Sequence, residues 1–175
     1  LLPANLKISR SLRKSIRCRG YRITADRDFT AVIEACAAPR EAMHGTWITR
    51  QMKSAYDRLH QLGYAHSFEA WLDEELVGGL YGVAIGRVFF GESMFTRRVD
   101  ASKVAFAAAV EFLRAREFRL IDCQVPSAHL TSLGATLIRR TEFVTLLEEH
   151  CAVARQPHSW RAEFAGSSVQ ELQRR

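Results

Sequence analysis

The chain has 175 residues, a mass of 19.8 kDa and a formal net charge of +6. Its composition is 47% hydrophobic and 25% charged, which is typical of a folded domain and excludes a disordered chain. The longest apolar run without glycine, Val104 to Val110, is too short to cross a bilayer, which takes about 20 residues. The first residues are basic and contain no apolar signal core, so neither a membrane-spanning nor a secreted protein is expected.

The positive charge lies at one end of the chain. Residues 1–22 contain seven basic side chains and no acidic one, whereas the rest of the chain carries 18 basic and 19 acidic side chains. The spacing predicts a helix from Ser9 to Cys18, with four cations on one face: Arg10, Arg13, Lys14 and Arg17. Like charges on one face repel each other, so the pattern favours a polyanionic partner over a merely solvated surface.

Cysteine and histidine usage argues against a metal or a disulfide framework. The four cysteines, at positions 18, 36, 123 and 151, form no Cys-x-x-Cys pair, and the six histidines do not fall at ligand spacing from them. Such usage is typical of a reducing compartment, so we expect a cytoplasmic protein. We expect no metal and no cofactor.

The first half of the chain predicts helices followed by an antiparallel meander. Asp26 is expected to cap a helix over 27–37 that ends at Pro39, and a further helix runs from Thr49 to Gly63. Segments 65–72, 76–85 and 88–95 then read as three strands joined by tight turns.

The second half predicts alternating helices and strands. They are a helix over 101–116 capped by Asp100, a buried strand from Phe118 to Val125, a short helix through Leu133, a strand over 135–140 and a helix from Thr141. The tail from about residue 155 is polar and is expected to be loosely held. We therefore divide the chain into a basic helical segment (1–22), a catalytic domain (23–154) and a polar tail (155–175).

This order of elements predicts an α+β fold, in which helices cover a mixed, largely antiparallel sheet. The order is similar to that of acyl-CoA N-acyltransferase (GNAT) folds. Those folds bind acetyl-CoA at a glycine-containing loop between the central strand and the next helix. Here residues 95–100 contain no glycine and offer no such close-approach cradle, which disfavours acetyl-CoA.

Two of the predicted apolar strands carry polar residues near their ends, where a buried strand would be expected to continue with apolar ones. Asp122 and Gln124 share one face of the predicted strand, where they form either a hydrogen-bonded structural pair or part of a site. Glu92 and Met94 likewise share a face, which would place a charged anchor beside an apolar pocket. Trp47 is a candidate for stacking on a ligand, or else a core or lid residue.

Several uninterrupted motifs resemble those of the bacterial leucyl/phenylalanyl-tRNA–protein transferases. The resemblance covers about residues 6–147. The motifs are Gly45-Thr46-Trp47-Ile48, Ala55-Tyr56, Leu59-His60, Ala65-His66-Ser67, Leu76-Val77-Gly78-Gly79-Leu80-Tyr81-Gly82, Gly91-Glu92-Ser93-Met94-Phe95, Ala101-Ser102-Lys103, Leu120-Ile121-Asp122-Cys123-Gln124 and Ser132-Leu133-Gly134-Ala135.

The resemblance implies a GNAT-like enzyme that moves Leu or Phe, and Met less well, from aminoacyl-tRNA to the N-terminal Arg or Lys of an acceptor protein, marking it for degradation. It implies that Asp122, Gln124 and Glu92 line the place where the acceptor amine attacks, and that Trp47 contacts the terminal adenosine. The residues expected to hold the aminoacyl side chain are Leu80, Phe89, Met94 and Ile121. Those expected to contact the tRNA acceptor stem are Arg10, Lys14 and Arg17.

The family also carries an N-terminal domain with a Trp-Trp-x-Pro-x-x-Arg segment, which has no counterpart in this sequence. The sequence is therefore expected to be either a fragment of a longer protein or a truncated form that lacks this domain. We also expect a monomer. Two alternatives remain open at this point: a GNAT-type N-acetyltransferase that uses acetyl-CoA, and a non-catalytic tRNA-binding remnant.

Overall fold

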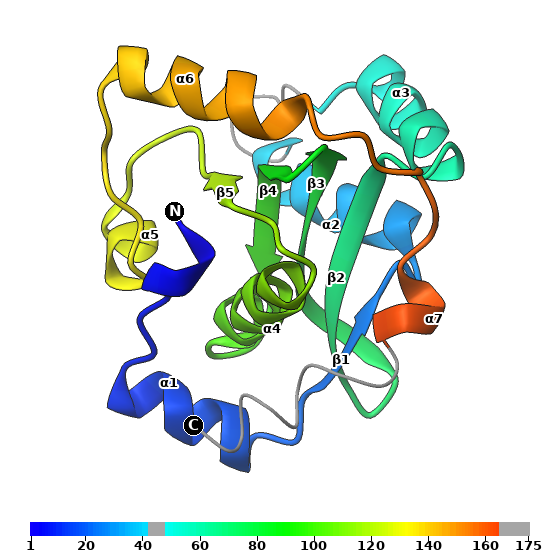
Figure 1. Cartoon of the computed structure of the whole chain (residues 1–175). Helices are drawn as coiled ribbons and strands as arrows, with labels where there is room; N and C mark the ends of the chain where they lie inside the picture. The colour runs from blue at the N-terminus through cyan, green and yellow to red at the C-terminus, as the bar shows by residue number, and fades with distance from the viewer. Residues whose placement is uncertain (42–47, 165–175) are drawn as a thin grey trace.

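A computed structural model of the protein describes residues 1–41 and 48–164 (Figure 1). Its centre is a five-stranded sheet in the order β1-β2-β3-β4-β5, antiparallel except for the parallel pair β4–β5. The strands are β1 (Arg22–Ala25), β2 (Ala65–Leu72), β3 (Glu75–Ile85), β4 (Val88–Thr96) and β5 (Leu120–Asp122). The predicted meander is confirmed as β2–β4, whereas β1 was not predicted.

Helices cover both faces of the sheet. Helix α4 lies in front of the sheet in Figure 1 and α2 lies behind it, so each face has its own hydrophobic cluster. The helical elements are η1 (Pro3–Asn5), α1 (Arg10–Cys18), α2 (Phe29–Glu41), α3 (Arg50–Gln61), α4 (Ala101–Ala115), α5 (Ala128–Ser132), α6 (Arg140–Cys151) and α7 (Arg161–Phe164). The predicted α+β class is therefore confirmed. None of the helices that the structure describes has both the length and the apolar character needed to span a membrane.

Turn chemistry explains why the meander forms. Asp73 and Glu74 link β2 to β3 with φ of 48° and 64°, and Gly86 links β3 to β4 with φ of 57°. Positive φ at both positions of a two-residue link matches the twist of the flanking strands. Gly86 is also required for space, because an added Cβ would collide with the carbonyl oxygen of His150 at the end of α6.

A β-bulge interrupts the pairing of β3 with β4. Tyr81 pairs with Ser93 and Gly82 pairs with Gly91, so Glu92 is the extra residue of β4. On its other side β4 pairs with β5 only as far as Phe90 and Asp122, although β4 continues to Thr96. The two parallel strands therefore separate directly after Asp122, next to the bulge.

The predicted strand from Phe118 to Val125 is too long. Strand β5 ends at Asp122 and forms the edge of the sheet, where Leu1 exchanges two backbone hydrogen bonds of 2.8 Å with Ile121. Gln124 then turns into the left-handed region with φ of 58°. The strand predicted over 135–140 is also wrong, because residues 136–140 are exposed and pair with no strand.

Asp26 does not cap α2, as the sequence had suggested. It is buried with φ of 53°, and Asp28 takes the capping role by accepting a 3.0 Å bond from the backbone N–H of Ala31. Helix α2 also continues through Pro39 to Glu41, since a proline near the last turn removes just one backbone donor.

The segment after Cys151 is not loosely held where the structure describes it. Trp160 and Phe164 are each 4% exposed and belong to the hydrophobic cluster beneath α4. The backbone N–H of Trp160 donates a 2.7 Å bond to the buried carboxylate of Asp26. Trp160 and Phe164 therefore anchor the otherwise exposed segment 155–164 to the core, and the expectation of a loose tail is wrong for this segment.

Candidate active site

The three polar residues predicted for the site come together where β4 and β5 separate. The side-chain amide of Gln124 donates a 3.1 Å hydrogen bond to the Glu92 carboxylate. The backbone N–H of Gln124 donates a 2.8 Å bond to Oδ1 of Asp122. Gln124 thus links the two carboxylates, which belong to neighbouring strands.

The way Asp122 and Gln124 meet differs from the prediction. They do not share the face of one strand, because Gln124 has already left β5 in a left-handed conformation. The Asp122 side chain closes a short turn over the Gln124 N–H instead. Asp122 is half-buried and Gln124 is exposed, so solvent and hydrogen bonds offset the cost of placing these polar groups here.

The bulge also separates Glu92 from Met94. Glu92 interacts with the Tyr56 hydroxyl of α3, on the α2–α3 face of the sheet. Burial, followed by the charge and hydrogen bond of Glu92, raises the pKa of Tyr56 well above its usual value. Met94 packs against the cluster beneath α4. The prediction that Glu92 and Met94 share a face is therefore wrong, because the extra residue in β4 reverses the alternation.

The four apolar residues predicted for the site do lie together, on the α4 face. Leu80 of β3 pairs with Met94 of β4, and Phe89 of β4 pairs with Ile121 of β5. Leu80, Phe89 and Ile121 are at most 3% exposed, whereas Met94 is half-buried. Met94 is thus the accessible member of the group, and the other three form its floor.

The polar and apolar groups therefore lie on opposite faces of the sheet and meet at its opening. The strands are still close at Gly91, where an added Cβ would come within 3.3 Å of the carbonyl oxygen of Asp122. Beyond this point the β5 side of β4 pairs with no strand among residues 1–41 and 48–164. A ligand at the opening could contact carboxylates on one face and apolar side chains on the other.

A cleft of about 590 Å³ adjoins the polar residues. Asp122 and Gln124 line it together with Leu130 of α5 and Phe143 of α6. It is therefore continuous with the polar side of the site and provides room for a substrate larger than a single amino acid.

The basic helix α1 forms as predicted, with Ser9 as its cap. Leu12 and Ile16 are buried, while Arg10, Lys14 and Arg17 are exposed on its outer side. Figure 1 shows α1 at the bottom of the molecule, at the opposite end from α6. Trp47, the predicted contact for adenosine, lies outside the described residues.

The start of α4 does not resemble an open phosphate cradle. Asp100 stands at the N-cap position with φ of 60°, but its side chain makes no capping hydrogen bond, in contrast to the prediction. Its carboxylate instead accepts a 2.8 Å bond from the Ser15 hydroxyl of α1 and lies 3.1 Å from the Lys103 ammonium. At this helix end a phosphate would meet the carboxylate of Asp100, whose hydrogen-bond and ionic partners already come from this chain. Within the described parts of the chain, moreover, no group of three or more His, Cys, Asp or Glu side chains could hold a metal ion.

Two residues near the site are not among those predicted from the sequence. Tyr56 belongs to one of the family motifs but has no site role predicted from the sequence, because its contact with Glu92 depends on the bulge, which leaves no clear mark in the sequence. Trp160 was assigned to the tail. The pattern of Trp160 and Phe164, two aromatic residues one helical turn apart in a polar segment, was the available signal that the segment is buried.

Comparison with solved structures defines the class of the fold. An aminoglycoside acetyltransferase from an uncultured soil metagenomic sample, in complex with sisomicin, superposes with a TM-score of 0.55 at 15% identity, covering 70% of this chain and 92% of that one. A predicted acetyltransferase with acetyl-CoA from Clostridium acetobutylicum gives 0.54 at 12% identity, covering 69% and 92%. The chain therefore has the GNAT-like fold that was predicted.

Sequence comparison then identifies the family. The family model described as leucyl/phenylalanyl-tRNA protein transferase matches residues 1–148. A curated leucyl/phenylalanyl-tRNA–protein transferase from Methylococcus capsulatus is 56% identical over 92% of this chain, which covers 68% of that relative. One from Azoarcus sp. is 54% identical over 94% of this chain, which covers 70% of that relative. The protein belongs to the leucyl/phenylalanyl-tRNA–protein transferase family, a family of transferase enzymes, as the sequence motifs had indicated.

Proposed function

We propose that this protein transfers Leu or Phe, and Met less well, from aminoacyl-tRNA to the N-terminal Arg or Lys of acceptor proteins, which marks them for degradation. It would act in the cytoplasm as a monomer. Membership of the family supports aminoacyl transfer from tRNA to protein. The observation that carries the assignment of the site is the cluster of Glu92, Asp122 and Gln124 at the separation of β4 and β5.

The reaction needs positioning more than activation. The α-amine of the acceptor attacks the carbonyl carbon of the aminoacyl ester, a C–N bond forms, and the C–O bond to the ribose breaks. The 3′ oxygen of the tRNA leaves with a proton. Because the ester is already activated, neither a protein nucleophile nor a metal is required, and the main tasks are orientation and deprotonation of an ammonium with a pKa of about 8.

The polar cluster suits the acceptor. We propose that Glu92 attracts the cationic N-terminal residue, since it lies on the α3 side with its charge only partly offset by hydrogen bonds. Asp122 has one oxygen engaged by the Gln124 N–H, and its other oxygen, which has no hydrogen-bond donor among the described residues, would receive the amine or its proton. Gln124, held between the two carboxylates, would orient both.

The apolar group suits the aminoacyl side chain. We propose that Leu80, Phe89 and Ile121 form the floor of its pocket and that Met94, which is half-buried and flexible, adapts to Leu or Phe. The ester carbonyl would then lie at the strand opening between the two faces. Discrimination between such side chains is expected to be modest, since one methylene contributes about 1–3 kcal/mol.

The two remaining predicted contacts concern the tRNA. We propose that Arg10, Lys14 and Arg17 of α1 contact acceptor-stem phosphates, which fits their exposure on the outer side of that helix. Trp47 would stack on the terminal adenosine. In this assignment residues 1–22 serve tRNA binding, and the sheet with its helices within residues 23–154 carries the chemistry.

Transfer of labelled Phe from Phe-tRNA to a peptide that begins with Arg tests the proposal. The combined change Asp122→Ala and Gln124→Ala is expected to lower kcat/KM at least 100-fold, whereas a peptide that begins with Ser is not labelled. Glu148→Ala with Gln156→Ala, which also removes one carboxylate and one amide from exposed positions, is the matched control. Full activity in the Asp122/Gln124 variant would refute the proposed site.

Acetyl transfer from acetyl-CoA is the alternative that the fold alone would permit. The Asp100 carboxylate at the start of α4, and the absence of glycine in residues 95–100, both disfavour pyrophosphate binding there. Calorimetry with acetyl-CoA is expected to give no binding signal at millimolar ligand. Binding of acetyl-CoA without transfer of Phe would favour the alternative, and salt-sensitive tRNA binding without transfer would favour a non-catalytic tRNA-binding protein.

A further inference from the structure

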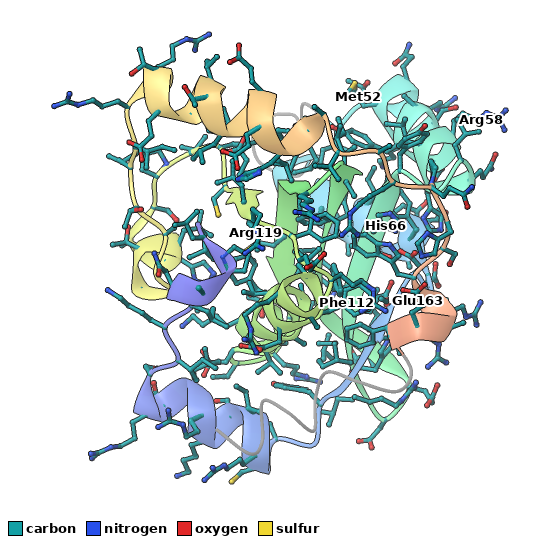
Figure 2. The ribbon with its side chains drawn as sticks, viewed as in Figure 1. Met52, Arg58, His66, Phe112, Arg119 and Glu163 are labelled. Carbon is teal, nitrogen blue, oxygen red and sulfur yellow. The ribbon has the colours of Figure 1, made fainter. Side chains whose placement is uncertain are left out.

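The C-terminal segment inserts an aromatic side chain into the core directly behind the aminoacyl pocket. The Trp160 ring stacks on the His66 ring of β2 with centroids 3.4 Å apart and planes 2° apart. It also lies 5.2 Å from the Phe112 ring of α4, and both of these neighbours are labelled in Figure 2. Three more rings surround it, those of Phe118, Phe68 and Phe89, with centroids 5.8, 5.9 and 6.1 Å from that of Trp160.

The sheet register explains why Phe89 lies beside Trp160. His66, Gly82 and Gly91 form one row across β2, β3 and β4. A Cβ added at Gly82 would lie 2.6 Å from Cζ of Phe89 and would collide with the carbonyl oxygen of Phe90. The Phe89 ring therefore occupies the space that a side chain at Gly82 would fill. On one side of it Trp160 lies over His66, and on the other side Gly91 lies at the strand opening.

Trp160 is held rigidly in this position. Its backbone N–H donates a 2.7 Å bond to Oδ2 of Asp26, and the same oxygen is 2.9 Å from Nδ1 of His66. The other Asp26 oxygen accepts a 3.0 Å bond from the backbone N–H of Ser67. One buried carboxylate thus fixes both the backbone of Trp160 and the ring on which its indole stacks.

We propose that Trp160 is a positioning residue that sets the depth of the aminoacyl pocket, an inference that rests on the proposed function. By filling the space over β2, Trp160 prevents Phe89 from moving away from Gly91. The position of Phe89 in turn limits the size of the aminoacyl side chain that fits beside Leu80 and Ile121. A smaller residue at 160 would let Phe89 withdraw toward β2 and would enlarge the pocket at the strand opening.

The test compares aminoacyl preferences in Trp160→Phe with those of the unmodified protein. The ratio of kcat/KM for Phe-tRNA to that for Leu-tRNA is expected to rise about tenfold, the lower end of the effect of one methylene in an apolar pocket. The change is expected mainly in KM, because the polar cluster on the other face is untouched. Transfer from Tyr-tRNA is expected to become detectable, since a deeper pocket accepts a longer ring.

A matched control separates positioning from general loosening of the core. Phe164→Leu alters the same segment and the same aromatic group, but Phe164 contacts Phe68 and Phe112 rather than Phe89. This variant is expected to lower the Tm while leaving the Phe-to-Leu ratio within twofold of its original value. Trp160→Tyr is made alongside, so that a folded variant is available should Trp160→Phe not fold.

The outcomes distinguish this inference from the proposed function. If the unmodified protein transfers neither Phe nor Leu, the proposed function fails, and the inference fails with it. If it transfers both, and a folded Trp160 variant keeps the original ratio within twofold, the inference alone is overturned. Equal changes of the ratio in the Trp160 and Phe164 variants would also overturn it, because they would point to loss of stability rather than to the position of Phe89.

Discussion

Replacement of Asp26 by asparagine is expected to destabilise the protein strongly, although the side chains are nearly the same size. Asp26 is 5% exposed, and its two oxygens accept bonds from the His66 ring, the Ser67 N–H and the Trp160 N–H. The amide of the asparagine side chain would direct an NH₂ group at one of these donors. At least one buried donor would then lose its acceptor, and the remaining bonds would lose the assistance of the charge.

The magnitude follows from the number of bonds affected. An unpaired buried donor costs about 1–3 kcal/mol, and weakening of the other bonds adds about 1 kcal/mol. The total loss is therefore about 2–4 kcal/mol of the free energy of unfolding. In a domain of this size each kcal/mol shifts the Tm by about 2–4 °C, so the Tm of the Asp26→Asn variant is expected to fall by about 5–15 °C.

The pH dependence has a definite sign. Burial alone would raise the pKa of Asp26, but the hydrogen bond and charge of His66, with the N–H groups of Trp160 and Ser67, lower it below its usual value. A carboxylate with a lowered folded pKa contributes stability above its unfolded pKa of about 3.9, and this is lost as the pH falls through the folded value. The difference in Tm is therefore expected to persist from pH 7.5 to pH 5 and to shrink only below about pH 4.

Above about pH 4, His66 determines how the stability of the unmodified protein and of the Asp26→Asn variant depends on pH. Burial, as the largest cause, lowers the pKa of His66 despite the neighbouring Asp26 carboxylate. The unfolded chain therefore takes up a proton below about pH 6.5 that the folded protein does not, and stability falls with the pH in the unmodified protein and in the variant alike. The change from aspartate to asparagine removes an influence that raises the His66 pKa, so the variant gains no resistance to acid.

Thermal unfolding followed by circular dichroism at pH 7.5, 5 and 3.5 checks these expectations. Asp28→Asn is the matched control, because Asp28 is an exposed helix cap and asparagine caps equally well. That control is expected to change the Tm by less than about 2 °C, on the scale of 2–4 °C per kcal/mol. Equal Tm shifts in the two variants, or a shift in Asp26→Asn that disappears at pH 5, would refute the role given to Asp26.

Three further predictions concern other parts of the molecule. Gly82→Ala is expected to lower the free energy of unfolding, measured by urea denaturation, by at least about 3 kcal/mol, because its Cβ would collide with the Phe90 carbonyl oxygen and press on Phe89. A decrease below about 1 kcal/mol would contradict the packing described. Glu69 is fully buried, and burial, as the largest cause, raises its pKa, so the ionised form is penalised at neutral pH and this penalty is lost as the pH falls through the raised folded value. The free energy of unfolding of Glu69→Gln at pH 7 is therefore expected to stay within about 1 kcal/mol of that of the unmodified protein. Glu69→Ala leaves the Thr24 and Ser67 hydroxyls without their acceptor and is expected to cost about 3 kcal/mol in the same assay. Arg10→Glu with Lys14→Glu is expected to raise the KM for Phe-tRNA about tenfold at low salt with an unchanged Tm, and an increase that does not weaken with added salt would exclude a phosphate contact.

The sequence predicted well those elements whose identity depends on local patterns. Alternating side chains and two-residue turns marked β2, β3 and β4, and the apolar stripe of residues 101–116 marked α4. The basic helix was predicted almost to the residue from the spacing of its cations, and the structure adds the Ser9 cap and the buried face of Leu12 and Ile16. Such features are encoded within about ten residues, so a single sequence is enough to find them.

The errors arose where distant segments decide the structure. Strand β5 ends early because the chain turns into the left-handed region at Gln124, whose side chain bonds Glu92, 32 positions away. Asp26 has the sequence context of a helix cap, yet it is drawn into the core by His66 and Trp160, which are far away in the chain. The extra residue at Glu92 could not be predicted either, since a bulge is defined by the register of the partner strand.

The bulge at Glu92 is also what gives the proposed site its two sides. With unbroken alternation, Glu92 and Met94 would point to the same face, and a carboxylate would lie in the apolar group at a cost of several kcal/mol. The extra residue turns Glu92 toward Tyr56 while Met94 remains with Leu80 beneath α4. Because β4 and β5 separate at the same point, an ester carbonyl placed there could have its apolar side chain on one face and be attacked by an amine from the other. Deleting Gly91 keeps every proposed site residue, but it restores regular pairing by placing Glu92 opposite Gly82, on the face of Met94. This variant should keep the sheet and lose transfer activity, and full activity would show that the site needs only the residue types.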